Sequence, residues 1–177
     1  MKFLILFFLT ITTIFANSSK EILLLHSYNN GLKWTDGITQ GIKEILDKYP
    51  EFELTIEYMD SKKIDSQEYF DILMNLYEKK FSNRKYSVVI AADNYAYEFV
   101  LKNHKKLFDE SSVVFTGVEN FDKDFIPLEL KKYVTGVVEY KEIKENIELI
   151  KKTITDLNTL YIISDDTFSS LAIKEQI

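Results

Sequence analysis

Short apolar runs alternate with amphipathic segments along most of the chain. Runs of this kind, bounded by polar or turn-forming residues, are typical of strands that lie inside a sheet. We expect strands at Glu21–Leu25, Glu53–Met59, Tyr86–Ala91, Ser112–Phe115, Val134–Val138 and Leu160–Ile163. The second of them alternates strictly between polar and apolar residues, which predicts a half-exposed strand.

The segments between these runs carry apolar residues every three or four positions, which is the spacing of one buried helix face. Thr35 can cap the first helix, and Asp65 or Ser66 can cap the second. We expect further helices at Tyr95–Phe108, after Val138 and at Ser169–Ile177. The residues expected to face the core are Ile38, Ile42, Ile45, Leu46, Tyr69, Ile72, Leu73, Leu76, Tyr77, Phe99, Val100, Leu107, Ile143, Ile147 and Ile150.

Alternating strands and helices predict βαβ units, and therefore a parallel sheet with helices on both faces. Right-handed crossovers between parallel strands leave few topologies. Among these we favour a doubly wound α/β sheet in the order 2-1-3-4-5. Because a new strand and the start of a helix follow near the end of the chain, we expect the sequence to be an N-terminal fragment of a longer protein.

The beginning of the chain, MKFLILFFLTITTIFANSSK, is typical of a secretory signal peptide. One early lysine precedes an uncharged apolar run from Phe3 to Phe15, and Ala16 and a polar stretch follow. The run is short for a bilayer core of about 30 Å; the alternatives are an uncleaved anchor and a buried helix. We assign residues 1–16 to a signal peptide. This predicts a periplasmic protein and leaves open a membrane anchor in a full-length form.

Composition narrows the range of partners. The 177 residues include 28 acidic and 22 basic ones, for a net charge of −6. We expect no nucleic-acid partner, because phosphate binding normally requires a basic face. The chain has no cysteine and only two histidines, so we expect no disulfide, no metal site and no cofactor.

Polar and aromatic residues gather where the expected strands end. In open parallel sheets, ligands bind beyond the carboxyl ends of the strands, at the switch point of the topology. The candidate ligand-binding residues there are His26, Ser27, Tyr28, Asn29, Trp34, Asp60, Asp93, Asn94, Tyr95, Thr116, Gly117, Glu119 and Glu139. The aromatic rings would offer flat apolar surface, and the polar groups would orient a small molecule.

Several of these side chains also have a purely structural interpretation. His26 could bond to the backbone at a strand end, and Trp34 could anchor its loop in the core instead of stacking on a ligand. Asp93 and Asn94 could cap the helix that follows them. Such a helix end also offers free N–H groups to an anionic ligand.

The candidate residues lack the parts that common enzymes need. The sequence has no G-x-S-x-G turn, no cysteine nucleophile and no glycine-rich phosphate loop. His26, Ser27 and a nearby aspartate could be drawn as a hydrolase triad, but adjacent residues of an extended strand point to opposite faces. We therefore expect no catalytic residue in this segment. An exported α/β hydrolase and a protein-interaction module remain as alternatives.

Several stretches of the sequence together resemble one protein family. They are ILLLHSYNNGLKWTDGITQGI, EYMDSKK, SVVIAADNYAYEFVLKN, VVFTGVENFD, VTGVVEYKEIKENIELI and LYIISDDTFSS. In order and in spacing they are similar to periplasmic sensor domains related to ABC-transporter substrate-binding proteins. Lys63 stands where these proteins usually have arginine.

The resemblance implies a two-lobed, type-I periplasmic-binding fold with a ligand in the cleft and hinged closure. Residues 17–138 would form the first lobe, and residues 139–177 the crossover and the truncated beginning of the second. Such domains often precede a transmembrane helix and a histidine kinase or diguanylate cyclase, and others serve ABC importers. The resemblance thus implies recognition of a small molecule, with amino-acid-like ligands among the candidates. A membrane-anchored signalling or permease partner would receive the signal or the solute.

Overall fold

The computed structural model describes residues 20–165, 170–171 and 174. The elements follow one another as β1 (Lys20–His26), α1 (Lys33–Leu46), β2 (Phe52–Tyr58), α2 (Gln67–Phe81), β3 (Tyr86–Ala92), α3 (Asp93–Leu107), β4 (Ser112–Val118), the 3-10 turn η1 (Lys123–Phe125), β5 (Val134–Val138) and α4 (Ile143–Thr153). The expected signal peptide lies outside the described residues. Within them, none of the helices has the length and apolarity that crossing a membrane requires.

The five strands form one sheet in which every pairing is parallel. The strand order is β2-β1-β3-β4-β5, so the predicted α/β class and topology are confirmed. His26, the last residue of β1, pairs with Tyr58 on one side and with Ala92 on the other. The ends of β1, β2 and β3 therefore meet at one edge of the sheet, next to the switch point between β1 and β3.

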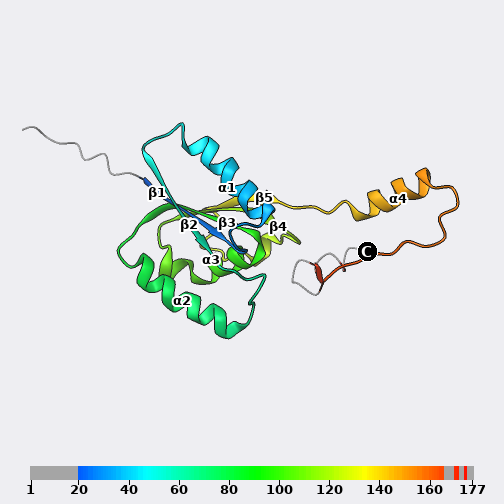
Figure 1. The fold of residues 1–177 in the computed structure, drawn as a ribbon. Helices are drawn as coiled ribbons and strands as arrows, with labels where there is room; N and C mark the ends of the chain where they lie inside the picture. Colours follow the sequence, from blue (N-terminus) through cyan, green and yellow to red (C-terminus); the bar gives the residue numbers. More distant parts are fainter. Residues whose placement is uncertain (1–19, 166–169, 172–173, 175–177) are drawn as a thin grey trace, which may run out of the picture.

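Helices cover the two faces of the sheet unequally. Figure 1 shows α1 on one side of the sheet and α2 and α3 on the other. The α2–α3 side holds the hydrophobic core, where Leu23, Val89 and Val113 are fully buried. Tyr77 and Phe81 of α2 stack there with ring centroids 5.1 Å apart. On the opposite side, α1 buries only Thr35.

The boundaries and faces of the first two helices differ from the prediction. Residue Thr35 does not cap α1, because the helix begins two residues earlier at Lys33. Ile45 was expected to face the core but is 54% exposed, because α1 lies loosely on its side of the sheet. Ser66, one of the two expected caps, does accept a hydrogen bond from the Tyr69 N–H at the start of α2.

The buried side of α2 is displaced from the expected one. Leu73 and Tyr77, four residues apart, face the core as expected. Ile72 and Leu76 are more than half and about half exposed. Each of them precedes a core residue by one position, and one position turns a side chain by about 100° around a helix of 3.6 residues per turn.

The last part of the chain departs furthest from the expectation. Helix α4 is present but buries none of its residues, and Figure 1 shows it on an arm that leaves the sheet. The segment expected as a strand, Leu160–Ile163, is not one, and Tyr161 and Ile163 are almost fully exposed. A strand needs a neighbour to complete its backbone hydrogen bonds, and no described strand lies beside this segment. The expected helix Ser169–Ile177 lies largely outside the described residues.

Gly136 controls the attachment of β5 to the sheet. A Cβ atom at this position would lie 2.5 Å from Cγ of Phe115 on β4. We expect Gly136→Ala to lower the free energy of unfolding by about 1–3 kcal/mol, since the added methyl group would collide with the backbone and ring of Phe115 on the neighbouring strand. Urea denaturation checks this. As a control, Gly41→Ala meets open space on α1 and should stabilise by about 0.5–1 kcal/mol; equal effects of the two variants would contradict the prediction.

Candidate functional site

Ser27, the first residue after β1, joins three strand ends. Its hydroxyl donates to the Ala92 carbonyl at 2.8 Å and accepts from the Ala96 N–H at 2.8 Å. Its carbonyl accepts from the backbone N–H of Ser61 at 2.9 Å and from the Ser61 hydroxyl at 2.5 Å. Ser27 and Ser61 are both buried. These bonds fix the segments that follow β1, β2 and β3 relative to one another.

His26 is buried on the α1 side of the sheet. Its Nε2 lies 2.8 Å from Oγ1 of Thr39, and its ring stacks on Tyr58 with centroids 5.3 Å apart. Burial lowers the pKa of His26 to about 4, against an opposing effect of Asp36, so the ring is neutral at physiological pH. The hydrogen-bond partner of the ring is a side chain on α1, not the backbone partner that the structural interpretation expected. The Ser27 hydroxyl is bonded to backbone groups instead, so the serine–histidine pair of a hydrolase is not formed here.

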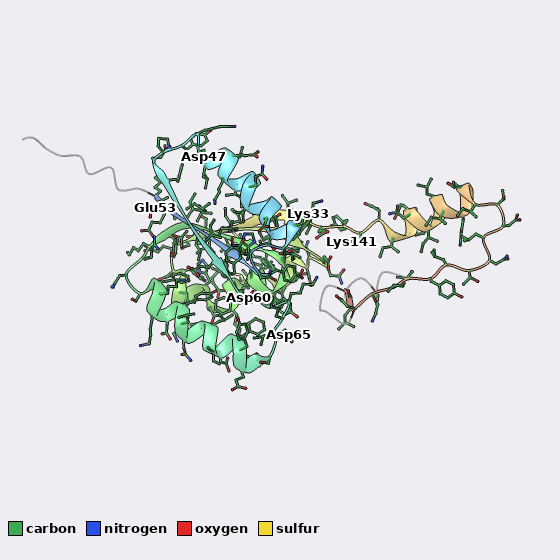
Figure 2. The ribbon with its side chains drawn as sticks, viewed as in Figure 1. Lys33, Asp47, Glu53, Asp60, Asp65 and Lys141 are labelled. Atoms are coloured by element: carbon green, nitrogen blue, oxygen red, sulfur yellow. The ribbon has the colours of Figure 1, made fainter. Side chains whose placement is uncertain are left out.

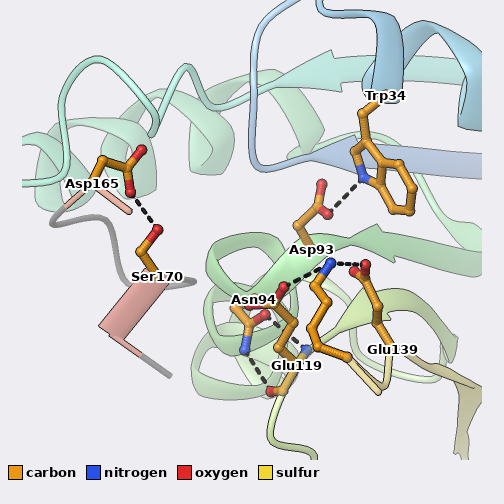
Figure 3. A network of polar contacts seen from close by, with 8 residues as sticks. Trp34, Asp93, Asn94, Glu119, Glu139, Asp165 and Ser170 are labelled. Atoms are coloured by element: carbon orange, nitrogen blue, oxygen red, sulfur yellow. Dashed lines mark hydrogen bonds and ion pairs between the residues drawn. The ribbon is translucent and has the colours of Figure 1, made fainter. Parts of the chain in front are cut away.

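Trp34, Asp93 and Gly117 meet at the carboxyl edge of the sheet. The indole N–H of Trp34 donates to Oδ1 of Asp93 at 2.9 Å (Figure 3). Asp93 begins α3 with φ 69°, a left-handed conformation that aspartate adopts more readily than most residues. Gly117 is also left-handed, with φ 67°. A Cβ atom on Gly117 would lie 2.8 Å from Asp93 Oδ1 and 3.4 Å from the Trp34 ring, so the contact requires glycine.

The Asp93 carboxyl is poised between its two protonation states. Burial raises the pKa of Asp93 to about 7, and the hydrogen bond from Trp34 opposes this rise. The negative charges of Glu139 and Glu119 raise the pKa further, whereas Lys62 lowers it. Asp93 is 4% exposed, and its Oδ2 has no hydrogen-bond partner among the described residues.

Asn94 and Glu119 tie the start of α3 to the end of β4. The Asn94 side chain donates to the Glu119 carbonyl and accepts from the Glu119 N–H, both at 3.1 Å. The structure therefore does not support capping as the role of Asn94 or Asp93: the residue in the cap position is Ala92, and α3 has no side-chain cap bond.

Lys141 connects the crossover after β5 to the same network. Its ammonium lies 3.3 Å from Oε1 of Glu119 and is hydrogen-bonded to Glu139. Burial lowers the pKa of Lys141, but the hydrogen bond to Glu139 and the two negative charges outweigh it, and the net direction is upward. Oε2 of Glu119 is buried without a partner among the described residues. Figure 3 shows Asp93, Asn94, Glu119 and Glu139 lying together.

An open hollow of about 360 Å³ adjoins this network. Its volume lies within the range of small-molecule sites, which begins at roughly 300 Å³. Asn94 and Glu119 contribute polar groups to the wall, and Tyr97 and Phe121 contribute aromatic rings. The wall thus combines apolar surface with a few polar groups, as ligand pockets commonly do.

The structure brings about half of the sequence-predicted candidates into one network. These are Trp34, Asp93, Asn94, Gly117, Glu119 and Glu139. Thr116 lies inside β4, where it pairs with Ala92 and Val137. His26 and Ser27 are buried at the end of β1 and anchor the strand ends.

The remaining candidates lie around this network and have other partners. The Lys62 ammonium lies 5.4 Å from the centre of the Tyr28 ring, and the Asn29 amide donates to the neighbouring carbonyl of Asn30. The Tyr95 hydroxyl donates to Asp65. Asp60 forms an exposed ion pair with Lys63 at 3.4 Å. Figure 2 shows Asp60 and Asp65 before α2, apart from Lys33 and Lys141.

Lys141 is the network residue that the sequence reasoning missed. The available signal was its spacing from Glu139, because side chains two residues apart in extended chain share one side.

Comparisons of the chain with protein-family models, with curated proteins and with solved structures give no match. Among the described residues, no group of three or more histidines and acidic residues is arranged to hold a metal ion.

A methyl group on Gly117 should disturb the centre of the site. Gly117→Ala would meet Asp93 and Trp34 and would hold a left-handed conformation at a cost of about 1–2 kcal/mol. We expect a lower midpoint of thermal unfolding and a shifted emission of Trp34, the only tryptophan of the chain. Gly37→Ala, which meets open space, serves as the control. Unchanged emission in Gly117→Ala would contradict the assigned contact.

The buried Asp93 carboxyl should make stability depend on pH. Its pKa is about 7 in the folded chain against an ordinary 3.8, so the folded state binds the extra proton between these values. Stability from this group is therefore complete below about pH 4 and is lost as the pH rises toward 7. We expect Asp93→Asn to be more stable than the wild type at pH 8, on the order of a few kcal/mol, with the difference vanishing near pH 4. Denaturant unfolding across this range checks it; a pH-independent difference would contradict the assignment.

Proposed function

We propose that the chain is an extracytoplasmic solute-binding or sensing domain that recognises a small molecule at the carboxyl ends of its parallel strands. The observation that carries the proposal is the network of Trp34, Asp93, Glu119 and Glu139 beside the open hollow. It lies where open parallel sheets bind ligands. The signal-peptide-like beginning of the chain supports export.

Strained and buried polar features concentrate at this edge. Asp93 and Gly117 both have left-handed backbone, and Asp93 and Glu119 each carry a buried oxygen without a partner among the described residues. Features of this kind are costly and cluster at functional sites. A bound molecule that donates hydrogen bonds would remove part of that cost.

The resemblance to periplasmic sensor domains supports a signalling output. A membrane-anchored kinase or cyclase would read the movement of the crossover that begins after β5, since Lys141 ties this crossover to the site. Service to an ABC importer, with an amino-acid-like solute, is the alternative. The signalling and transport alternatives differ in the partner protein, and both use the same strand-end site for the solute.

Trp34, whose indole bonds to Asp93 of the network, offers a direct test of the proposed site. We expect at least one class in a panel of amino acids, organic acids, sugars, nucleosides and amines to raise the thermal midpoint of the purified chain, because a ligand that binds only the folded state stabilises it. Trp34→Ala should weaken the apparent affinity for that compound at least tenfold and thereby reduce the shift of the thermal midpoint. Tyr49→Ala is the matched control, since Tyr49 lies just beyond α1 with the same exposure, 49% against 48% for Trp34.

The panel also tests the proposed function as a whole. A panel without any stabilising compound would overturn the solute-binding proposal. An equal loss of binding in Trp34→Ala and Tyr49→Ala would place the site elsewhere on the chain.

A further inference from the structure

Two buried carboxylate oxygens at the site lack donors. Oδ2 of Asp93 and Oε2 of Glu119 have no hydrogen-bond partner among the described residues, and the two residues are 4% and 6% exposed. An ionised carboxylate only accepts hydrogen bonds, so the group that completes these oxygens in their charged form has to donate. Buried acceptors without donors are rare in native proteins and indicate a missing partner.

The charges around these oxygens select a cation. Asp93 faces the negative charges of Glu119, after β4, and of Glu139, after β5. Lys62, after β2, supplies the opposing positive charge, and Trp34 of α1 supplies a neutral N–H donor. The start of α3 would by itself attract an anion, but its first residue is Asp93, which repels one.

The chain already places a primary ammonium group in this cluster. The Lys141 ammonium contacts Glu119 at 3.3 Å and is bonded to Glu139. An ammonium carries three donors and a compact charge, which suits several carboxylate oxygens at once. The half-exposed Trp34 ring adds a flat surface, and indole attracts cations more strongly than other aromatic rings do.

We propose that this site recognises a small molecule through a primary ammonium group, which Asp93 and Glu119 bind while Trp34 contacts the apolar part of the molecule. The inference rests on the proposed solute-binding function and names the class of its ligand. Lys141 occupies part of the same acidic cluster when no ligand is bound, and a ligand ammonium competes with it for Glu119.

The pH dependence of binding follows from the same residues. Burial raises the pKa of Asp93 to about 7, so this carboxyl is largely neutral at pH 6 and charged at pH 8. Binding of an amine that is charged at both values should therefore be tighter at pH 8, by up to about tenfold. It should weaken with salt, because the attraction is between charges.

Titration calorimetry with matched probes tests the inference on the purified chain. Phenethylamine carries an aromatic ring and an ammonium group, and 3-phenylpropionate carries the same ring and a carboxylate. Ethanolamine and cadaverine are ammonium probes without a ring. We expect phenethylamine to bind, more tightly at pH 8 than at pH 6, and 3-phenylpropionate to bind at least tenfold more weakly.

The variants separate recognition from a structural role of the acidic residues. Asp93→Asn and Glu119→Gln should each weaken phenethylamine binding at least tenfold while cooperative unfolding is retained. Asp109→Asn, which changes an exposed aspartate just beyond the opposite end of α3, should bind as the wild type does. Lys141→Met should bind phenethylamine more tightly, because the competing ammonium is removed; a purely structural ion pair predicts no gain.

The outcomes distinguish this inference from the function on which it rests. Stronger binding of 3-phenylpropionate than of phenethylamine, or unchanged amine binding in Asp93→Asn, would overturn the inference and leave solute binding intact. The inference also falls, and solute binding again stands, if none of the ammonium probes binds but the broad panel yields a ligand without an amine. If no compound of any class binds, both proposals fall.

Discussion

The strand-end region depends on the hydrogen bonds of one buried residue, Ser27. Its hydroxyl holds the end of β3 and the first turn of α3, and its carbonyl holds the segment after β2. These bonds hold the connections after the three strands in fixed positions relative to one another. Because Ala96 lies only three residues beyond Asp93, the same bonds also fix where the Asp93 carboxyl can lie.

The site gathers features that oppose stability. A left-handed glycine and a left-handed aspartate lie against the Trp34 indole, and the buried carboxyl of that aspartate has one oxygen without a partner in the described part of the chain. The reciprocal bonds between Asn94 and Glu119 hold this arrangement in place. Local conflicts of this kind, held by a regular surrounding sheet, are typical of functional sites in general.

Much of the fold follows from the sequence because its signals are local. Short apolar runs such as Tyr86–Ala91 favour strands inside a sheet, and their alternation with helical segments indicates parallel pairing. The exact faces of α1 and α2 do not follow, since both helices carry more apolar residues than their contacts bury, as Ile72 shows. The segment Leu160–Ile163 has the composition of a strand, but a strand also needs a neighbour, which composition does not report.

The candidate site could be predicted only to the level of which residues follow the strands. Trp34, Asp93 and Glu119 were found in this way because parallel strands end at one edge. Their pairing could not be predicted, because the Trp34–Asp93 bond joins residues 59 positions apart and depends on the space left by Gly117. The burial of Ser27 and His26 could not be predicted either, because the sequence presents them only as polar residues at the end of a strand.

His26 and Asp93 have a joint consequence for the proton balance of unfolding. The folded chain keeps the His26 ring unprotonated down to about pH 4 and the Asp93 carboxyl protonated up to about pH 7. Between about pH 4 and 6.5, unfolding therefore releases one proton from the aspartate and takes one up at the histidine. The two transfers cancel, so the chain exchanges almost no net proton with solvent at these two residues. Two groups that are each sensitive to acidity together contribute almost no pH dependence to stability over this interval.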